Sequence, residues 1–453
     1  MRPRRSPDQI GHSMKTKIRA GGMVAMAATV ALVAAACGGG DNGNGGSADG
    51  NGVEITWWHN GTGEPLLGFW EDVAQEFEDK NPGVTINIQA FQNEELRNTV
   101  LPNAFAGGNA PDLFQSWGGG ELAQWVEDGI VKDLSDVASD TIDAIGTPAT
   151  AWQVDGKTYG LPYTFGPAGF WVNTDLWEKA GLDTTNFPTT WDELFAAWST
   201  LKDAGITPVA VGGLDGWPAA HWWYHTAVST VSPETFEKAM STGDFSDPAW
   251  EKTGENLQTI LDANAFNDGW QATSAQQGAA SSAGMVALGQ AASELMGVWN
   301  GGVMGGIYNE ANGLDENSQE LQENHLGWFP FPAFANGEGD GRILGGGDGF
   351  SVHADAPAET VDFLKYILSE DVQRRYVALG NSPALASLGA EIEDPAQAAA
   401  QKALANASGV QLWLDTAFGP AVANPMNDAI VQFMQGNGTP QQVVDAISNS
   451  WAG

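Results

Sequence analysis

The chain has 453 residues with 56 acidic and 19 basic side chains, which gives a formal net charge of −37. This charge argues against binding to nucleic acid or to anionic lipid, because both are negatively charged themselves. The length exceeds what a single hydrophobic core usually supports, so two lobes are expected. The single cysteine permits no internal disulfide or cysteine metal cluster, and the 19 tryptophans favour a binding surface lined in part by aromatic rings.

The first 36 residues are typical of a secretory signal peptide. A basic stretch from Arg2 to Arg19 precedes an apolar run, 23–36, that is too short to span a bilayer comfortably. The residues Ala34-Ala35-Ala36-Cys37-Gly38 resemble the lipobox of bacterial lipoproteins, which implies that Cys37 is acylated. Ordinary secretion, with cleavage after Ala36 and a free thiol, is the alternative.

Residues 37–52 are predicted to form the lipid anchor and a flexible tether. From Gly38 to Gly52 the chain is almost entirely Gly, Asn, Asp and Ser, a composition that cannot bury enough apolar surface to fold. The expected location is therefore the extracellular face of the cytoplasmic membrane, with the lipid as the only contact to the bilayer.

Alternating strand and helix patterns follow the tether. Residues 53–58 and 84–91 are rich in β-formers, and apolar residues recur at helical spacing from Leu66 to Phe77 between them. A further helix follows, and then a strand that begins at Asp112. This order predicts an α/β fold of mainly parallel sheets flanked by helices, with ligand groups beyond the carboxyl ends of the strands.

The later part of the chain carries similar signals. Thr190-Trp191-Asp192-Glu193 is a capping box that opens a helix, 206–211 is predicted to be a strand, and the pattern from Pro357 onward is mostly helical. Some tryptophans recur at helical spacing and are predicted to pack in the core. These are Trp70, Trp125, Trp177, Trp191 and Trp198.

A series of motifs runs in order through the middle of the chain. They are Gly160-Leu161-Pro162-Tyr163, Phe170 to Trp177, Pro188 to Leu194, Gly289 to Trp299, Gly327 to Pro332 and Gly345 to Phe350. Together they resemble the extracellular solute-binding proteins of ABC sugar importers, the group that includes maltose-binding protein. The resemblance runs from about Val53 to the C-terminus.

This resemblance implies a two-lobed periplasmic-binding-protein fold of type II, with a hinge and a ligand cleft between the lobes. The chain is expected to cross between the lobes near Thr164-Phe165, near Trp328 and near Gly347-Asp348. The N-terminal lobe would then comprise 53–164 plus 328–347, and the C-terminal lobe 165–327 plus 348–453.

The resemblance also implies a function. The protein would capture a sugar outside the membrane, as a monomer without catalytic residues or cofactor, and deliver it to the membrane subunits of an ABC importer. It is nearest to family members for plant-derived oligosaccharides such as xylobiose.

A sugar site needs aromatic faces for the ring C–H groups and polar side chains for the hydroxyls. Such residues occur at strand ends, at the expected crossings and in the tryptophan-rich segment 217–225. The candidate ligand-binding residues are Trp58, His59, Asn60, Gln92, Trp117, Tyr163, Trp217, Trp223, Trp299, Asn300 and Asp348.

Two other functions fit the composition. A secreted glycoside hydrolase would use two carboxylates about 5–10 Å apart, and the many acidic residues leave that open. A sugar-binding scaffold outside transport would use tryptophans but would need no hinge. A metal site is not expected, because His221 and His225 share a helical spacing without an evident third ligand.

Overall fold

The computed structural model describes residues 52–451. The predictions for the signal peptide, for Cys37 and for nearly all of the tether fall outside this range. Between residues 52 and 451, none of the helices combines the length and the apolar character that crossing a membrane requires.

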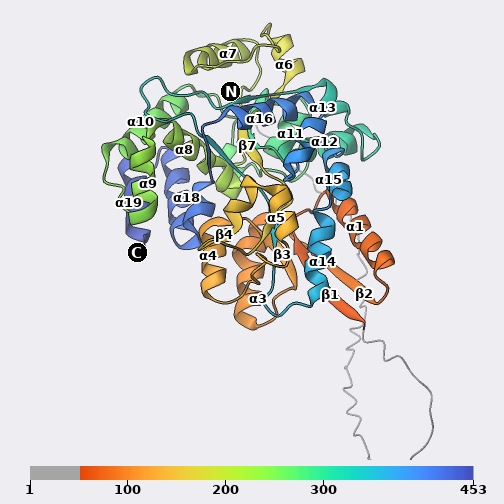
Figure 1. The fold of residues 1–453 in the computed structure, drawn as a ribbon. Coiled ribbons are helices and arrows are strands. Elements are labelled where there is room, and N and C mark those ends of the chain that lie inside the picture. Colours follow the sequence, from red (N-terminus) through yellow and green to blue (C-terminus); the bar gives the residue numbers. More distant parts are fainter. Residues whose placement is uncertain (1–51, 452–453) are drawn as a thin grey trace, which may run out of the picture. The chain divides into compact units, whose positions relative to one another are not determined.

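The first lobe is built on a five-stranded sheet in the order β2-β1-β3-β11-β6. Its strands β1, β2 and β3 lie in the lower part of Figure 1. Strand β1 is parallel to both β2 and β3, whereas β11 is antiparallel to β3 and to β6. The strand bounds are β1 Val53–His59, β2 Val84–Ala90, β3 Leu113–Ser116, β6 Leu161–Pro162 and β11 Gly349–Val352.

Helix α1 (Leu66–Lys80) confirms the predicted strand–helix–strand unit. Its apolar stripe includes Trp70 and Phe77, which are buried in the same core as Trp57 of β1. Helix α14 (Ala358–Ile367) packs Phe363 into that core from much later in the chain. The first lobe is therefore completed by residues that follow the second lobe in sequence.

The second lobe is built around β7 (Gly166–Asn173), which pairs with β8 (Ser293–Gly297), β9 (Leu326–Pro330) and β10 (Ile343–Gly346). All three pairings are antiparallel, so the expected mainly parallel order is wrong for this sheet. The chain enters the lobe on β7 and leaves it on β10. These two strands run side by side in opposite directions, and so they pair antiparallel.

Strand pairing also changes the expected lobe boundaries. Residues 328–347 contain parts of β9 and β10 and belong to the second sheet, while β11, α14 and α15 (Glu370–Val377) belong to the first lobe. Trp328 lies inside β9 and marks no crossing. The third crossing falls instead between α15 and α16, because α16 packs on β7 and β9. The helices of the second lobe in this region are α16 Pro395–Asn406, α18 Pro420–Met434 and α19 Pro440–Ser450.

Two of the crossings lie directly against each other. The segment from β6 to β7 and the segment from β10 to β11 run antiparallel, with Gly346 opposite Gly166 and Gly349 opposite Pro162. The amide of Tyr163 donates to the Asp348 carbonyl at 2.9 Å. A Cβ atom on Gly347 would lie 1.9 Å from the Thr164 carbonyl oxygen, so this approach requires glycine.

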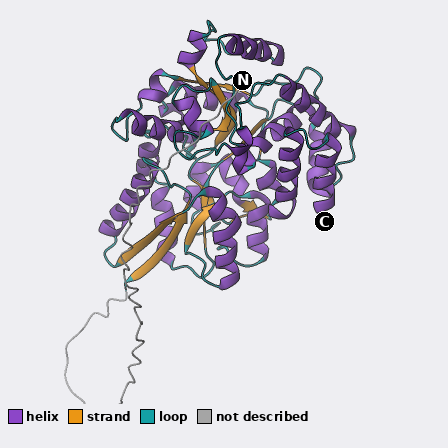
Figure 2. Ribbon diagram, turned by 180° about the vertical axis from the view of Figure 1, so that it is seen from behind, coloured by secondary structure: helices purple, strands orange, loops and turns teal. Residues whose placement is uncertain are grey.

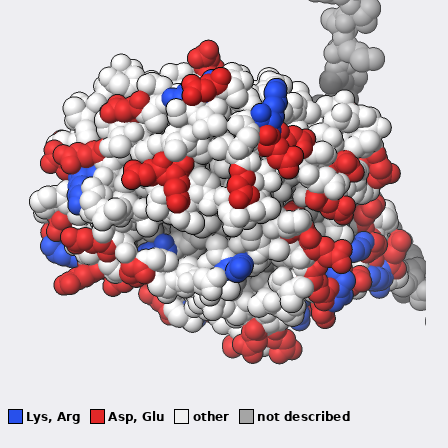
Figure 3. All heavy atoms as spheres, turned by 90° about the horizontal axis from the view of Figure 1, so that it is seen from above, with Lys and Arg blue, Asp and Glu red and all other residues white. Residues whose placement is uncertain are grey.

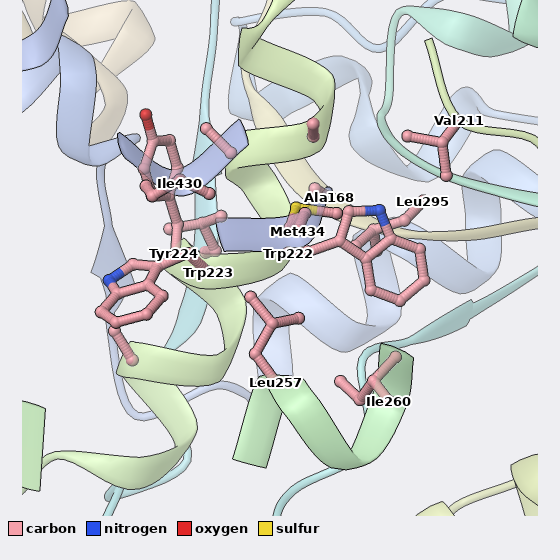
Figure 4. Close-up of a cluster of buried hydrophobic side chains, with 14 of the residues drawn as sticks. Ala168, Val211, Trp222, Trp223, Tyr224, Leu257, Ile260, Leu295, Ile430 and Met434 are labelled. Carbon is pink, nitrogen blue, oxygen red and sulfur yellow. The ribbon is translucent and has the colours of Figure 1, made fainter. Parts of the chain in front are cut away.

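Helix α8 (Trp217–Thr230) runs through the second-lobe core and is buried on all sides except at its ends. Figure 4 shows Trp222, Trp223 and Tyr224 pointing away from the helix in different directions. They pack among Leu257 of α10 (Pro248–Asp262) and apolar residues of α18. The tryptophan-rich segment is therefore mainly a structural helix, of which Trp217 and His221 face the ligand side.

Other predictions have mixed outcomes. All five tryptophans at helical spacing are at most 8% exposed, which confirms that they pack in the core. The capping box is present at the start of α7 (Trp191–Asp203). The predicted strand at 206–211 is reduced to single bridges at Thr207, Val209 and Ala210.

Helices surround both sheets, and long strands of the first-lobe sheet are visible between them in the view from behind (Figure 2). On the face in Figure 3, acidic side chains are spread widely and basic ones are few. This distribution fits the net charge and favours solubility.

Candidate functional site

A cavity of about 740 Å³ lies between the lobes and beside the crossings. The first lobe contributes the loops that follow β1, β2 and β3. The second lobe contributes the starts of α8 and α17 (Leu414–Phe418) and most of the length of α12 (Asn300–Asn312). The loops that the strand-end rule selected therefore line the first-lobe side of this cavity.

Aromatic rings form the second-lobe wall. The ring of Trp299 lies 6.2 Å from that of Trp217 and 5.7 Å from that of Trp413, measured between centroids. His221 stacks on Trp413 at 4.8 Å. Burial lowers the pKa of His221 to about 4, so this imidazole is neutral at physiological pH. The wall therefore presents uncharged aromatic surface to the cavity.

The first lobe supplies mainly polar groups. The Asn60 amide donates to Asn93 at 3.0 Å, and the Gln92 amide donates to the Thr62 hydroxyl at 3.0 Å. Trp117 adds an aromatic ring on this side, and the Arg97 guanidinium lies over that ring at 5.2 Å. Apolar and polar walls thus face each other across the cavity.

The floor of the cavity is formed at the crossings by Tyr163 and Asp348. Gln115, at the end of β3, donates its side-chain amide to Oδ1 of Asp348 at 2.9 Å. Burial raises the pKa of Asp348 to about 6, against the hydrogen bonds that stabilise its charged form. This carboxylate is an acceptor that a ligand hydroxyl can reach from either lobe.

The contacts that join the lobes around the cavity include the following four. Trp217 donates its indole N–H to Glu94 Oε1 at 2.6 Å, and Gln277 donates to Gln92 at 3.3 Å. Gly306 of α12 faces the carbonyl oxygen of Glu64, which would lie 2.2 Å from an added Cβ. The fourth is an ion pair, 3.7 Å long, between Arg97 and Asp415. The structure is therefore closed over its cavity.

Arg97 is held by two carboxylates. Besides Asp415, its Nε lies 3.2 Å from Glu121, which is 4% exposed. Burial raises the pKa of Glu121 while the guanidinium lowers it. The positive charge is thus neutralised within the wall, and the cavity lining is acidic overall.

Seven of the eleven candidate residues line the cavity: Asn60, Gln92, Trp117, Tyr163, Trp217, Trp299 and Asp348. The other four do not. Trp58 lies against Phe91 with ring centroids 5.5 Å apart, on the opposite face of β1 from Trp57. His59 is buried 4.8 Å from Trp57 and accepts the Gly61 amide on Nδ1.

Trp223 and Asn300 also point into the core. Trp223 is fully buried, with its ring 6.1 Å from Phe433 of α18. The Asn300 amide donates to Glu294 of β8 at 2.8 Å, so the side chain is turned away from the cavity although its neighbour Trp299 lines it.

Several lining residues were not among the sequence candidates. Glu94 directly follows the predicted Gln92-Asn93 strand end, so extending that motif by one residue would have included it. Trp413 and Asp415 have no local signal, because α17 reaches the site only through the tertiary fold. Among residues 52–451, no cluster of three or more His, Cys, Asp or Glu side chains is suited to a metal ion. His221 and His225 stack on different aromatic rings, Trp413 and Phe331.

Two α/β lobes that close over a cavity beside paired crossings define a ligand-binding protein of the two-lobed, hinged class. The chain belongs to the bacterial extracellular solute-binding proteins, a family that it matches over residues 61–374.

An uncharacterized ABC transporter extracellular-binding protein of Pyrococcus horikoshii is 27% identical over 289 residues. The match covers 62% of this chain and 60% of that relative, so the chain spans less than two thirds of the relative's length.

Solved structures share the fold over a longer range. One comes from work on xylan utilization by the thermophilic bacterium Caldanaerobius polysaccharolyticus. It has a TM-score of 0.77 and 24% identity, and covers 88% of this chain and 99% of that one. A chitin oligosaccharide binding protein has a TM-score of 0.76 and 24% identity. The match covers 88% of this chain and 98% of that one.

Proposed function

We propose that this protein binds an oligosaccharide in the cavity between its lobes and presents it to an ABC importer. The observation that carries the proposal is the opposition of Trp217, Trp299 and Trp413 to amides and carboxylates across a cavity of about 740 Å³. Sugars have apolar ring faces and polar edges, and this arrangement offers a partner to each. The volume suits a ligand larger than a monosaccharide and lies within the usual range of small-molecule sites.

Roles follow from position. The three tryptophans and Trp117 are proposed to stack on sugar rings. Gln92 and Asp348 are proposed to bind hydroxyls, together with Asn60 and Glu94. Xylobiose and related plant-derived oligosaccharides are the proposed ligands. Their xylose rings carry no charge, which suits a lining whose one guanidinium is already paired.

Closure is the proposed signal to the importer. A ligand held between the lobes favours the closed state because it contacts both of them. The contacts between Glu94 and Trp217 and between Gln92 and Gln277 form in that state. The family and the P. horikoshii relative support an importer as the partner.

Anchoring through Cys37 is part of the same proposal. A signal peptide, an acylated Cys37 and the tether up to Gly52 would hold a monomeric receptor at the extracellular face of the cytoplasmic membrane. Cys37→Ser is expected to release the protein into the medium with its sugar affinity intact. Retention in the membrane fraction would contradict the anchor.

Calorimetric titration of residues 52–453 with xylo-, malto- and chito-oligosaccharides tests the binding function. Saturable binding of at least one series, weakened in Trp299→Ala, is expected. The matched control is Trp58→Ala, which removes a tryptophan outside the cavity. Cleavage of the sugars during incubation, seen by chromatography, would favour a glycoside hydrolase instead. If none of the three oligosaccharide series binds, the proposal is refuted.

A further inference from the structure

A second cavity, about 330 Å³, adjoins the first. We call it the side cavity. It reaches from the residues after β2 to helix α18. The two cavities share their dividing wall, formed by Asn93, Glu94, Arg97, Asp215, Trp217 and Asp415.

The dividing wall is held by two side-chain contacts. One is the 2.6 Å hydrogen bond from Trp217 to Glu94, and the other is the 3.7 Å ion pair of Arg97 with Asp415. Each joins a first-lobe side chain to a second-lobe side chain. Because both contacts are made by side chains, a change of side-chain rotamer is enough to break them.

The lining of the side cavity suits sugar hydroxyls. It carries the amides of Asn98, Asn424 and Asn427 and the carboxylate of Asp428. Asn427 is held in place because its side-chain oxygen accepts a hydrogen bond from the buried Tyr224 hydroxyl. Amides and carboxylates bind hydroxyl groups well, whereas Trp217 is the only aromatic ring in this lining.

The side cavity also opens to solvent. Asn98, Asn424 and Asp428 are exposed, whereas Trp413 and Tyr163 on the far side of the main cavity are at most 5% exposed. A chain that outgrows the main cavity therefore has a polar route outward past Trp217, besides the rim of the main cavity, where Gln277 and Glu310 are exposed.

We propose that the side cavity is an additional subsite for a longer oligosaccharide, and that the Glu94–Trp217 hydrogen bond is the partition that such a ligand must open. The proposal rests on the proposed function. Short ligands bind with the partition closed. Longer ligands break the hydrogen bond, gain contacts with the amides of α18 and extend toward solvent.

The test compares oligosaccharides of two to six units, from whichever series binds, by calorimetry. Trp217→Phe keeps an aromatic ring but removes the N–H donor, and Trp58→Phe is the matched control. Within residues 52–451 the Trp58 indole nitrogen has no hydrogen-bond partner, so its removal breaks no hydrogen bond. Because the variant removes the donor of the hydrogen bond to the Glu94 carboxyl group, Trp217→Phe should raise the ratio of long-ligand to short-ligand affinity by about tenfold.

A second variant probes the subsite itself. Asn424→Ala, on the exposed rim, should lower the affinity for long ligands more than for short ones. An unchanged length profile in both Trp217→Phe and Asn424→Ala, with short ligands still bound, would refute the subsite alone. Absence of binding at every length would instead refute the oligosaccharide-binding function.

Discussion

Gln115 and Asp348 are joined by a 2.9 Å hydrogen bond that links the end of β3 to a crossing segment between the lobes. The bond places a carboxylate on the floor of the cavity, where burial raises its pKa to about 6. The amide stabilises the charged form, but desolvation is the larger effect. Asp348 thus binds its proton more tightly in the folded protein than in the unfolded chain.

This shift makes stability depend on pH with a defined sign. Below about pH 4 Asp348 is protonated in both states, and above about pH 6 in neither. Between them only the folded state holds the proton, so its contribution to stability falls as pH rises. Asp348→Asn lacks this effect and should gain stability relative to wild type by at most about 3 kcal/mol from pH 4 to pH 7. Urea unfolding of both proteins at several pH values checks it, and a constant difference would contradict it.

Glu294 provides a second pH test, inside the second-lobe core. It is 1% exposed, and burial raises its pKa to about 8 despite hydrogen bonds from Ser282 and Asn300. Glu294→Gln mimics the protonated carboxyl and can keep both partners. Wild type should lose stability relative to Glu294→Gln as pH rises from about 4.5 to 8, by a few kcal/mol on the order expected for such a shift. Parallel melting temperatures across that range would show that Glu294 is ionised in the fold.

Gly306 tests closure apart from folding. Its Cα faces the Glu64 carbonyl oxygen of the other lobe, and a Cβ would lie 2.2 Å from it. Gly306→Val should keep the lobes apart, weaken ligand binding by at least about tenfold through lost closure contacts, and leave each lobe folded. Small-angle scattering should show no compaction on adding ligand. Ala311→Ser, an exposed change on the same helix, is the control, and normal affinity in Gly306→Val would disprove the effect.

Gly347 tests the paired crossings. A Cβ there would overlap the Thr164 carbonyl oxygen at 1.9 Å, a backbone atom that cannot rotate away. Gly347→Ala should therefore lower stability by about 3 kcal/mol or more, in the range of severe backbone and packing defects. Gly63→Ala is the matched control, since nothing lies within 4 Å of its Cβ position. Equal melting temperatures for the two variants would mean that the crossings can separate at no cost.

Local patterns predicted the local elements well. The β1–α1–β2 unit and the capping box at Thr190 depend on residues close in sequence, so spacing and caps were sufficient. The order of strands in the second sheet was not predictable in this way, because β8, β9 and β10 reach β7 from distant parts of the chain.

The candidate site residues show the same difference between local sequence signals and tertiary packing. Asn60, Gln92 and Trp117 follow predicted strands and line the cavity. Trp223 is covered by α18, some two hundred residues later, and nothing near it in sequence distinguishes it from Trp217. Trp413 lines the cavity for the converse reason, since tertiary packing of α17 alone brings it there.

Asp348 and Tyr163 lie at the crossings, which form the pivot of a two-lobed protein whose lobes rotate against each other. Their contribution to ligand binding therefore differs from that of residues on a moving lobe. A pivot moves little when the lobes close, so groups on it make the same contacts with a ligand in the open and the closed state. Such groups set how tightly the open protein first holds a sugar but cannot drive closure, because only contacts that differ between two states shift their balance. In a hinged receptor of this kind, Trp217 and its neighbours on the moving lobe would supply the driving force, while the pivot carboxylate would govern initial capture.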